Sequence, residues 1–200
     1  MFGKNVCFLL GILIMASGCW GSQLEEAVDL PYMVNVPQET RSISFENPTG
    51  QKGKGGMAAS KIGVGRKGAA LRNLDPGQTV ILCDFEGPAV IRRMWATLPA
   101  KKENLLGFVI RAYWDYQETP SIEAPIGNFF GAAHGIAKAY QSAVHSMTDS
   151  AGMSIFLPMP FTKHAKITVT NEGTEKFVPF YYQIDLTIRE TLPSDVGRLH

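Results

Sequence analysis

The stretch that decides the fold is Pro179-Phe-Tyr-Tyr-Gln-Ile-Asp-Leu-Thr-Ile-Arg-Glu190, in which apolar and polar side chains alternate from Tyr182 to Ile188. Lys166-Ile-Thr-Val-Thr170 alternates in the same way. A period of two places successive side chains on opposite faces of a strand, so each strand buries one face and leaves the other in water. The pattern predicts two sheets packed face to face.

Further apolar runs have the same strand chemistry. They are short, rich in Val, Ile, Thr and aromatic residues, and separated by Gly, Pro, Asn and Asp. These runs cover residues 81–85, 89–98, 107–114, 121–126 and 153–157. The stretch 132–144 has Gly135 near its start and no capping box, so at most a short helical turn is expected there. The predicted fold is an all-β sandwich.

The composition sets the size of the folded part. The chain has 200 residues, is 45% hydrophobic and carries a formal net charge of +1. The part that follows a signal peptide, about 180 residues, is long enough to bury one core of ordinary size without disulfides. We expect one folded domain that begins near Arg41.

The N-terminus has the pattern of a signal peptide over residues 1–18. Lys4 precedes the apolar run Val6-Cys-Phe-Leu-Leu-Gly-Ile-Leu-Ile-Met-Ala16, which is too short to cross a hydrocarbon core of about 30 Å as a helix. Ala16-Ser-Gly-Cys19 resembles the bacterial lipobox, which predicts a lipid anchor on Cys19 and a location in the cell envelope. The alternative is an ordinary secretory signal cut near Gly18 or Gly21. Residues 19–40 would form a polar tether from the membrane to the domain.

Three cysteines are present, and only one belongs to the mature domain. Cys7 leaves with the signal peptide and Cys19 carries the anchor. Cys83 lies in the apolar run Thr79-Val-Ile-Leu-Cys-Asp-Phe85, where a lone cysteine is typically a buried small hydrophobe rather than a nucleophile. No disulfide within the chain is expected.

Residues 50–75 predict a long basic loop. Seven glycines lie between Gly50 and Gly68, and six cations lie from Lys52 to Arg72 with no acidic residue among them. Loops of this length in a compact domain are usually functional or disordered. Two interpretations stay open: a solvated loop, or a loop that folds over a polar ligand or a neighbouring subunit.

Several common motifs do not fit. Gly63-Val-Gly-Arg-Lys-Gly68 has the dinucleotide-binding spacing but no strand before it and no helix after it, and the run from Gly50 to Gly56 lacks the Gly-Lys-Ser/Thr ending of a phosphate loop. Nucleic-acid binding is not expected, because the basic loop is offset by an acidic remainder. The four histidines, His134, His145, His164 and His200, have no metal-ligand spacing, so neither a metal nor another cofactor is predicted.

The block from Tyr113 to Gly131 combines aromatic rings, carboxyl and amide groups and rigid Pro/Gly backbone. Sugar sites have this composition, because ring faces take C–H surfaces while polar side chains take hydroxyl groups. The same aromatic residues could instead form part of the core. Glycosidic bond cleavage needs two carboxyl groups about 5 Å or more apart, and the sequence alone does not pair any two of the candidates. These candidates are Asp84, Glu86, Asp115, Glu118 and Glu123.

Seven motifs follow one another along the chain. They are Arg41-Ser-Ile-Ser-Phe-Glu-Asn-Pro-Thr-Gly50 with the following Lys-Gly-Lys-Gly-Gly56, Phe85-Glu-Gly-Pro88 leading to Ile91-Arg-Arg-Met-Trp95, Tyr113-Trp-Asp115, Pro120-Ser-Ile-Glu-Ala-Pro-Ile-Gly-Asn-Phe-Phe-Gly131, Leu157-Pro-Met-Pro-Phe161, Thr170-Asn-Glu-Gly173 and Tyr181-Tyr-Gln-Ile-Asp185. Together and in this order they resemble glycoside hydrolase family 172. The resemblance covers residues 41–200.

The resemblance implies a tandem of two jelly rolls, assembly into trimers or hexamers, and a retaining furanosidase that acts on fructofuranose- or arabinofuranose-type linkages in oligo- or polysaccharides. It implies that two catalytic glutamates lie in a second roll beyond His200, since the last strand pattern runs into Leu192-Pro-Ser-Asp-Val-Gly-Arg-Leu-His200 without a closing segment. Residues 41–200 are then the N-terminal roll, catalytically inactive alone, with no catalytic residue assigned.

The resemblance also supplies candidates for the walls of a substrate pocket. They are Arg41, Glu46, Asn47, Trp95, Trp114, Asp115, Glu123 and His134. One position departs from the family pattern: Asn128 stands where the family usually has Asp, which keeps hydrogen bonding but removes the charge. Two alternatives to an enzyme part stay open, a non-catalytic carbohydrate-binding module and a structural subunit that supplies an oligomer face.

Overall fold

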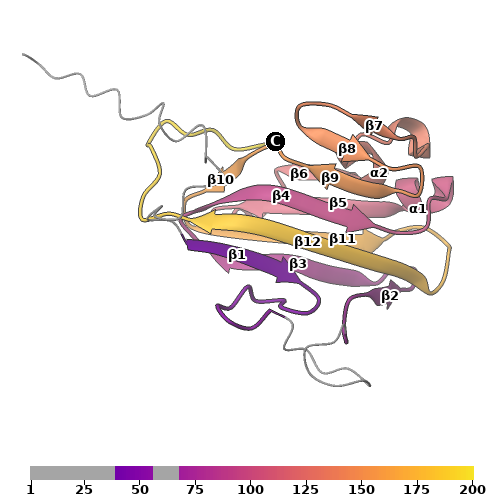
Figure 1. The fold of residues 1–200 in the computed structure, drawn as a ribbon, viewed down its shortest axis with the longest axis horizontal. Helices are drawn as coiled ribbons and strands as arrows, with labels where there is room; N and C mark the ends of the chain where they lie inside the picture. Colours follow the sequence, from indigo (N-terminus) through magenta and orange to yellow (C-terminus); the bar gives the residue numbers. More distant parts are fainter. Residues whose placement is uncertain (1–38, 56–67) are drawn as a thin grey trace, which may run out of the picture. The chain divides into compact units, whose positions relative to one another are not determined.

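The computed structural model describes residues 39–55 and 68–200, which form two antiparallel sheets packed as a sandwich (Figure 1). The predicted signal peptide, the anchor at Cys19, the tether up to residue 38 and residues 56–67 of the basic loop lie outside the described residues. Most of the Gly63–Gly68 motif lies outside them too. Within the described residues, no helix is long and apolar enough to cross a membrane.

The first sheet is built around its longest strand, β12 (Val178–Ile188), which pairs with β1 on one side and β4 on the other. The strand order is β1-β12-β4-β9-β8-β7, while β10 pairs with β4 and β2 pairs with β12. Their bounds are β1 (Glu39–Ser44), β2 (Arg72–Leu74), β4 (Ala89–Thr97), β7 (Tyr140–Gln141), β8 (His145–Met147), β9 (Gly152–Ile155) and β10 (Met159–Phe161).

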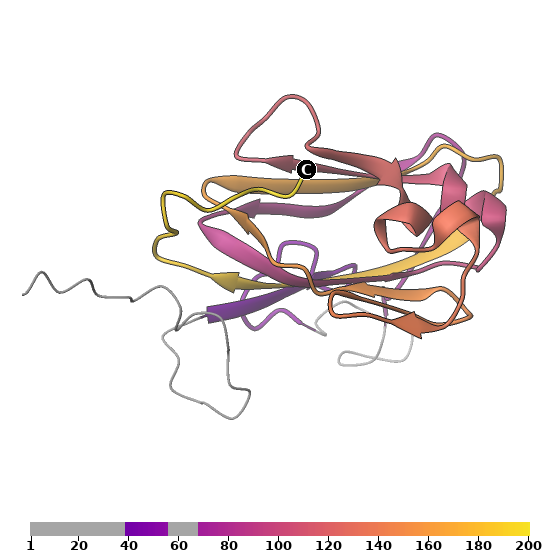
Figure 2. The same ribbon diagram turned by 90° about the horizontal axis from the view of Figure 1, so that it is seen from above.

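The second sheet has the order β3-β11-β5-β6. Its strands are β3 (Thr79–Glu86), β11 (His164–Asn171), β5 (Phe108–Trp114) and β6 (Ile122–Pro125). Seen from above, the yellow β12 and indigo β1 run side by side in one layer and the orange β11 lies in the other (Figure 2). Three short helical turns lie at one end of the sandwich, α1 (Lys102–Gly107), α2 (Ile126–Phe129) and η2 (Ala133–Gly135).

Alternation along the strands places the core between the sheets, as the sequence predicts. Strand β12 buries Phe180, Tyr182, Ile184 and Leu186, and β5 buries every second residue from Phe108 to Trp114. Apolar side chains on these facing surfaces leave water together, which is the main favourable contribution to folding of a sandwich. The all-β sandwich prediction is therefore confirmed.

All seven strands expected from the apolar runs are present, as β3, β4, β5, β6, β9, β11 and β12. The short helical turn expected within 132–144 corresponds to η2, in which His134 has a left-handed backbone with φ of 59°. The first strand begins at Glu39, so the expected domain start at Arg41 lies two residues inside β1. Cys83 is fully buried, and burial together with the neighbouring Asp84 charge raises its pKa to about 12, so this thiol is not a nucleophile.

Candidate functional site

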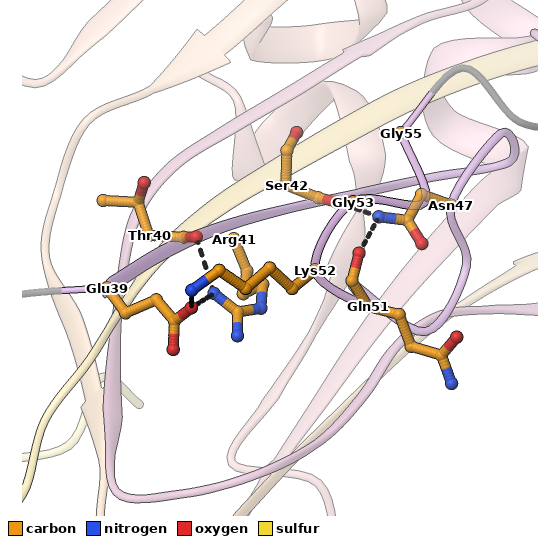
Figure 3. A pocket seen from close by; sticks show the side chains of 9 residues that line it. All are labelled: Glu39, Thr40, Arg41, Ser42, Asn47, Gln51, Lys52, Gly53 and Gly55. Carbon is orange, nitrogen blue, oxygen red and sulfur yellow. Dashed lines mark hydrogen bonds and ion pairs between the residues drawn. The ribbon is translucent and has the colours of Figure 1, made fainter.

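A polar pocket of about 390 Å³ lies between strand β1 and the loop that follows it (Figure 3). The β1 residues Glu39 to Ser42 form one wall, and the loop between Asn47 and Gly55 forms the other. The lining residues are Glu39, Thr40, Arg41, Ser42, Asn47, Gln51, Lys52, Gly53 and Gly55. None of the side chains in this lining is aliphatic or aromatic, so the pocket suits a hydrophilic ligand rather than an apolar one.

Asn47 holds the loop in place. Its backbone N–H donates to the carbonyl of Ser44 at 3.0 Å, which closes the turn after β1. Its side-chain Nδ2 donates to the carbonyl oxygens of Ser42 at 3.3 Å and Gln51 at 3.1 Å, so it ties the strand to the loop. The Asn47 side chain is largely buried, and its bonds to backbone set the width of the pocket.

Gly50 fixes the path of this loop. It has a left-handed φ of 62°, and a Cβ at this position would come within 2.9 Å of the Ile43 side chain. Only glycine adopts this conformation without strain and without displacing its neighbour. The Asn-Pro-Thr-Gly sequence at 47–50 therefore lets the loop lie close against β1.

Three charged side chains meet in the pocket. Arg41 Nη1 lies 2.8 Å and Lys52 Nζ lies 2.6 Å from the same Glu39 oxygen, Oε1. The hydrogen bonds from Arg41 and then Lys52 lower the pKa of Glu39 to about 2. Two cations share one carboxylate, so the cluster carries an excess positive charge. Arg41 Nη1 also donates to the carbonyl of Thr40 at 3.1 Å. A guanidinium carries five N–H donors in all, a geometry that suits hydroxyl or carboxylate oxygens of a ligand.

The ion pairs of Glu39 with Arg41 and Lys52 make the stability of the fold depend on pH. The folded-state pKa of about 2 lies below the ordinary value of 4.5, so the stabilisation is complete above pH 4.5 and is lost as the pH falls towards 2. We expect Glu39→Gln to have a lower melting temperature than the wild type at neutral pH, with the difference closing between pH 4.5 and 2. Thermal melts across this range, with the exposed Glu190→Gln as control, test this. A difference that does not change with pH would contradict it.

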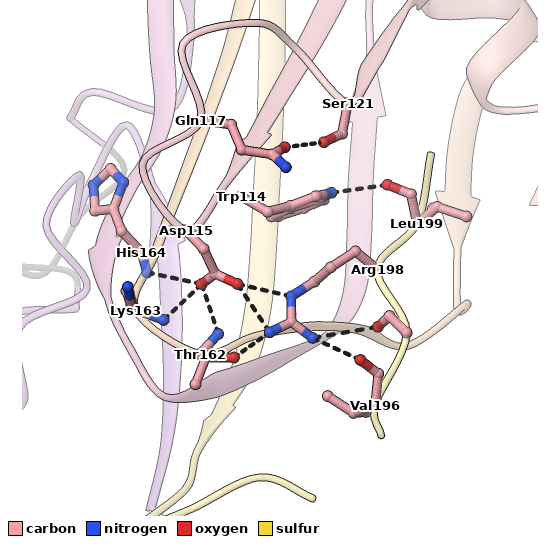
Figure 4. Close-up of polar contacts among 11 residues, drawn as sticks. Trp114, Asp115, Gln117, Ser121, Thr162, Lys163, His164, Val196, Arg198 and Leu199 are labelled. Carbon is pink, nitrogen blue, oxygen red and sulfur yellow. Dashed lines mark hydrogen bonds and ion pairs between the residues drawn. The ribbon is translucent and has the colours of Figure 1, made fainter. Parts of the chain in front are cut away.

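A second polar cluster surrounds Asp115 at the end of β5 (Figure 4). Asp115 Oδ1 accepts hydrogen bonds from the backbone N–H groups of Thr162 at 2.8 Å and Lys163 at 2.6 Å. Asp115 Oδ2 accepts from Arg198 Nε at 2.9 Å, and Arg198 also donates to the Thr162 hydroxyl. The carboxylate therefore joins three segments that are far apart in the sequence.

Burial alone would raise the pKa of Asp115, but the hydrogen bonds from Lys163, Arg198 and Thr162 outweigh it and hold the pKa below its usual range. The neighbouring Trp114 is 1% exposed, and its Nε1 donates to the carbonyl of Leu199 at 2.8 Å. Both side chains thus fasten the segment around residues 196–199 to the sandwich. Both Asp115 oxygens and the Trp114 N–H are engaged in these hydrogen bonds within the protein.

The structure places two of the eight predicted pocket residues, Arg41 and Asn47, in the pocket beside β1. Glu46 lies in the turn after β1, outside the lining of this pocket, and accepts a hydrogen bond from the N–H of Gly68 at 3.3 Å. The others lie elsewhere. Trp95 is on the outer face of the first sheet opposite Gln183 and Ser154, and Trp114 and Asp115 form the cluster just described. Their part in substrate binding stays a prediction.

Two predicted residues lie far from β1 in the topology. Glu123 is exposed on the second sheet, where its Oε2 accepts from Arg111 Nε at 2.7 Å. The same guanidinium binds Glu172 Oε1 at 2.7 Å, and the two glutamates together raise the pKa of Arg111. His134 is exposed on η2, and Asn128, the departure from the family pattern, is exposed on α2.

Sequence reasoning missed Glu39 and Arg198 as members of these clusters, and it named Lys52 only as a cation of the basic loop. Glu39 lies two residues before Arg41, so its spacing from that motif is the signal that could have found it. Arg198 lies 83 residues from Asp115, and no local pattern connects the two. In residues 39–55 and 68–200, no group of three or more His, Cys, Asp or Glu side chains is arranged to hold a metal ion.

Comparison with protein families identifies the chain. A family model described as GH172 domain-like matches residues 67–181, which is more than half of the sequence and includes β3 to β11. No curated protein matches the chain. The match agrees with the order of motifs in the sequence and with the sandwich fold, so the chain belongs to the GH172 domain-like family of glycoside hydrolases.

Proposed function

We propose that residues 39–200 are the carbohydrate-binding part of an exported, lipid-anchored glycoside hydrolase that cleaves fructofuranose- or arabinofuranose-type linkages with retention. The pocket beside β1 contacts the sugar. The observation that carries this is the charged and amide lining of that pocket, to which the Arg41–Gly50 motif contributes Arg41 and Asn47, in a chain of this family. Sugars are bound through many hydroxyl groups, which need such donors and acceptors.

In this proposal each pocket residue has a defined role. Arg41 donates to ring or hydroxymethyl oxygens from the guanidinium N–H groups that Glu39 does not use. Lys52 supplies a second donor, since its side chain is 80% exposed and its ammonium has N–H groups besides the one directed at Glu39. Asn47 acts as a positioning residue, because its Nδ2 is engaged with backbone and keeps the loop at its distance from β1.

The proposal assigns no catalytic carboxylate to the described residues. A retaining glycosidase uses one carboxylate as nucleophile and one protonated carboxyl group with a raised pKa as acid, about 5–5.5 Å apart. Of the described carboxyl groups with a shifted pKa, Glu39 and Asp115 are both shifted downwards. Each is also held by cations, so neither has the protonated state that an acid catalyst needs at neutral pH.

Arg41→Ala tests the binding role. The Arg41 side chain is only 15% exposed, and a hydrogen bond from a charged donor contributes about 1.5–3 kcal/mol. We expect the variant to weaken binding of arabinofuranose or fructofuranose oligosaccharides by about tenfold to a hundredfold in calorimetric titration. Lys176→Ala, which removes an exposed cation outside the pocket, is the matched control. Equal affinities of wild type and Arg41→Ala would overturn the assignment of this pocket.

A second candidate function is a carbohydrate-binding module without hydrolysis. The geometry of the pocket beside β1 favours it, since Glu39 is already paired with Arg41 and Lys52 and the lining offers hydrogen-bonding groups rather than an unpaired acid. Incubating the same oligosaccharides with the chain and analysing the products tests whether the chain hydrolyses them. New reducing ends would contradict the module and would show that the chain holds its own catalytic carboxylates, whereas both proposals expect binding without cleavage.

A further inference from the structure

A second pocket, of about 500 Å³, lies on the outer face of the second sheet. Register pairs Tyr113 of β5 with Lys166 of β11, and Lys166 with Asp84 of β3. Residues directly opposite each other on paired strands have Cβ atoms about 4.5–5.5 Å apart, so these three side chains form a continuous row across the sheet. The lining residues are Asp84, Tyr113, Tyr116, Gln117, Glu118, His164 and Lys166.

Tyr116 folds over this row as an aromatic platform. Its ring stacks on His164 with centroids 4.6 Å apart and planes at 3°. Its hydroxyl bonds to Glu86 Oε2 at 2.6 Å, which fixes the outer end of the ring. Tyr116 is nevertheless 58% exposed, so one ring face rests on His164 and the other is open to solvent.

His164 is held under the ring in turn. Its Nε2 lies 2.6 Å from Asp84 Oδ1, and its side chain is 11% exposed. The pair sets both the ring plane of His164 and the orientation of the Asp84 carboxylate. Lys166, Gln117 and Glu118 add an ammonium, an amide and a carboxylate to the lining of the same pocket.

The backbone that carries Tyr116 is strained and anchored. Asp115 and Tyr116 have φ of 55° and 67°, a left-handed conformation that non-glycine residues rarely adopt. Such conformations persist where the surroundings hold them, and they concentrate at binding sites. Here Asp115 accepts from the N–H groups of Thr162 and Lys163, immediately before His164. The same carboxylate therefore fixes the loop of Tyr116 against the segment that presents His164.

We propose that this pocket is a second carbohydrate-binding site, separate from the pocket beside β1. The open face of Tyr116 takes the C–H face of a sugar ring, and Asp84, Lys166 and Glu118 bind its hydroxyl groups. An exposed, rigid aromatic ring surrounded by polar side chains fits a sugar better than a purely ionic ligand. The choice of sugar as ligand class rests on the proposed function, while the location and the residues rest on the geometry alone.

Tyr116→Gly tests this site. Glycine adopts the φ of 67° without strain, so the variant removes the ring and keeps the fold. The probes are arabinotetraose and fructotetraose in calorimetric titration. We expect the variant to lose one class of binding sites, or to bind sugar at this site about tenfold more weakly than the wild type. Tyr116→Phe keeps the platform and loses only the bond to Glu86, so we expect its affinity within about threefold of wild type. Lys166→Ala is a second variant, which weakens the same site by removing its ammonium group. Lys166 lies in strand β11, so this change does not affect a residue with a left-handed backbone.

Phe177→Ala is the matched control, because it removes an exposed aromatic ring, 69% accessible, that lies outside both pockets. Two binding sites, one lost in Arg41→Ala and one in Tyr116→Gly or Lys166→Ala, would support both proposals. One site that only Arg41→Ala removes would overturn the second site and leave the first. One site that only Tyr116→Gly and Lys166→Ala remove would overturn the pocket beside β1 and leave the second site. No binding of either probe by the wild type would overturn both.

Discussion

Trp114→Ala is expected to lower the free energy of unfolding by about 3–5 kcal/mol, the usual loss when a buried aromatic side chain is truncated. Trp114 is 1% exposed in the core and stacks on Phe161 with centroids 6.4 Å apart. The variant leaves a large cavity and removes the indole N–H that donates to the carbonyl of Leu199. Urea denaturation measures the change directly.

Trp95→Ala is the control for this prediction. It removes the same side chain from the outer face of the first sheet, where the ring is half-buried, so we expect a clearly smaller loss. A loss below about 1 kcal/mol for Trp114→Ala would contradict the core position. Because the stability effect is large, reduced sugar binding by Trp114→Ala would not by itself assign the residue to a binding site.

Asp115→Ala is expected to destabilise the protein by about 2–4 kcal/mol, because it leaves two backbone N–H groups and the Arg198 guanidinium without their acceptor. Asp115→Asn should lower the free energy of unfolding by about half as much as Asp115→Ala. Asparagine keeps one oxygen for the two N–H groups and tolerates the left-handed φ, but it lacks the charge that pairs with Arg198.

Hydrogen exchange gives a local measure of the same change. Thr162 and Lys163 donate their backbone N–H groups to Asp115, so in Asp115→Ala we expect these two amides to exchange faster than in the wild type, while amides in β12 keep their rates. Asp195→Ala, which removes an exposed carboxylate three residues before Arg198, is the control and should leave both stability and exchange unchanged. Unaltered exchange of Thr162 and Lys163 in Asp115→Ala would contradict the role of Asp115 as their acceptor.

The sequence predicted the long strands well because their burial pattern is local. Strand β12 alternates between buried and half-buried residues from Val178 to Leu186, and the sequence of β11 alternates between apolar and polar residues from Ala165 to Thr170, so each contains its own signal. Strands β2, β7, β8 and β10 have two or three residues each and no alternation to detect. They are strands because neighbouring strands supply hydrogen-bonding partners, β12 for β2, β4 for β10, β9 for β8 and β8 for β7. Such pairing depends on the folded sandwich rather than on local propensity.

The candidate sites also differ in whether a local sequence signal predicts them. Arg41, Glu46 and Asn47 lie within seven residues of one another, so a sequence motif could bring them together. The platform at Tyr116 needs Asp84 and His164, which are 80 residues apart and meet only through the pairing of β3 with β11. For the aromatic block from Tyr113 to Gly131 the sequence left two interpretations open, a part of the core or a sugar site. In the structure Trp114 and Phe130 are buried in the core, while Tyr116 is exposed to solvent.

The most direct test of the central claim, that the pocket beside β1 binds furanose sugars, is a titration of the isotope-labelled protein with arabinotetraose and fructotetraose, followed by amide chemical shifts. The account predicts saturable shifts for Arg41, Asn47 and Gln51, including the Asn47 side-chain amide, with either probe. Shifts that leave this pocket untouched at saturating sugar, or no shifts anywhere, would contradict it.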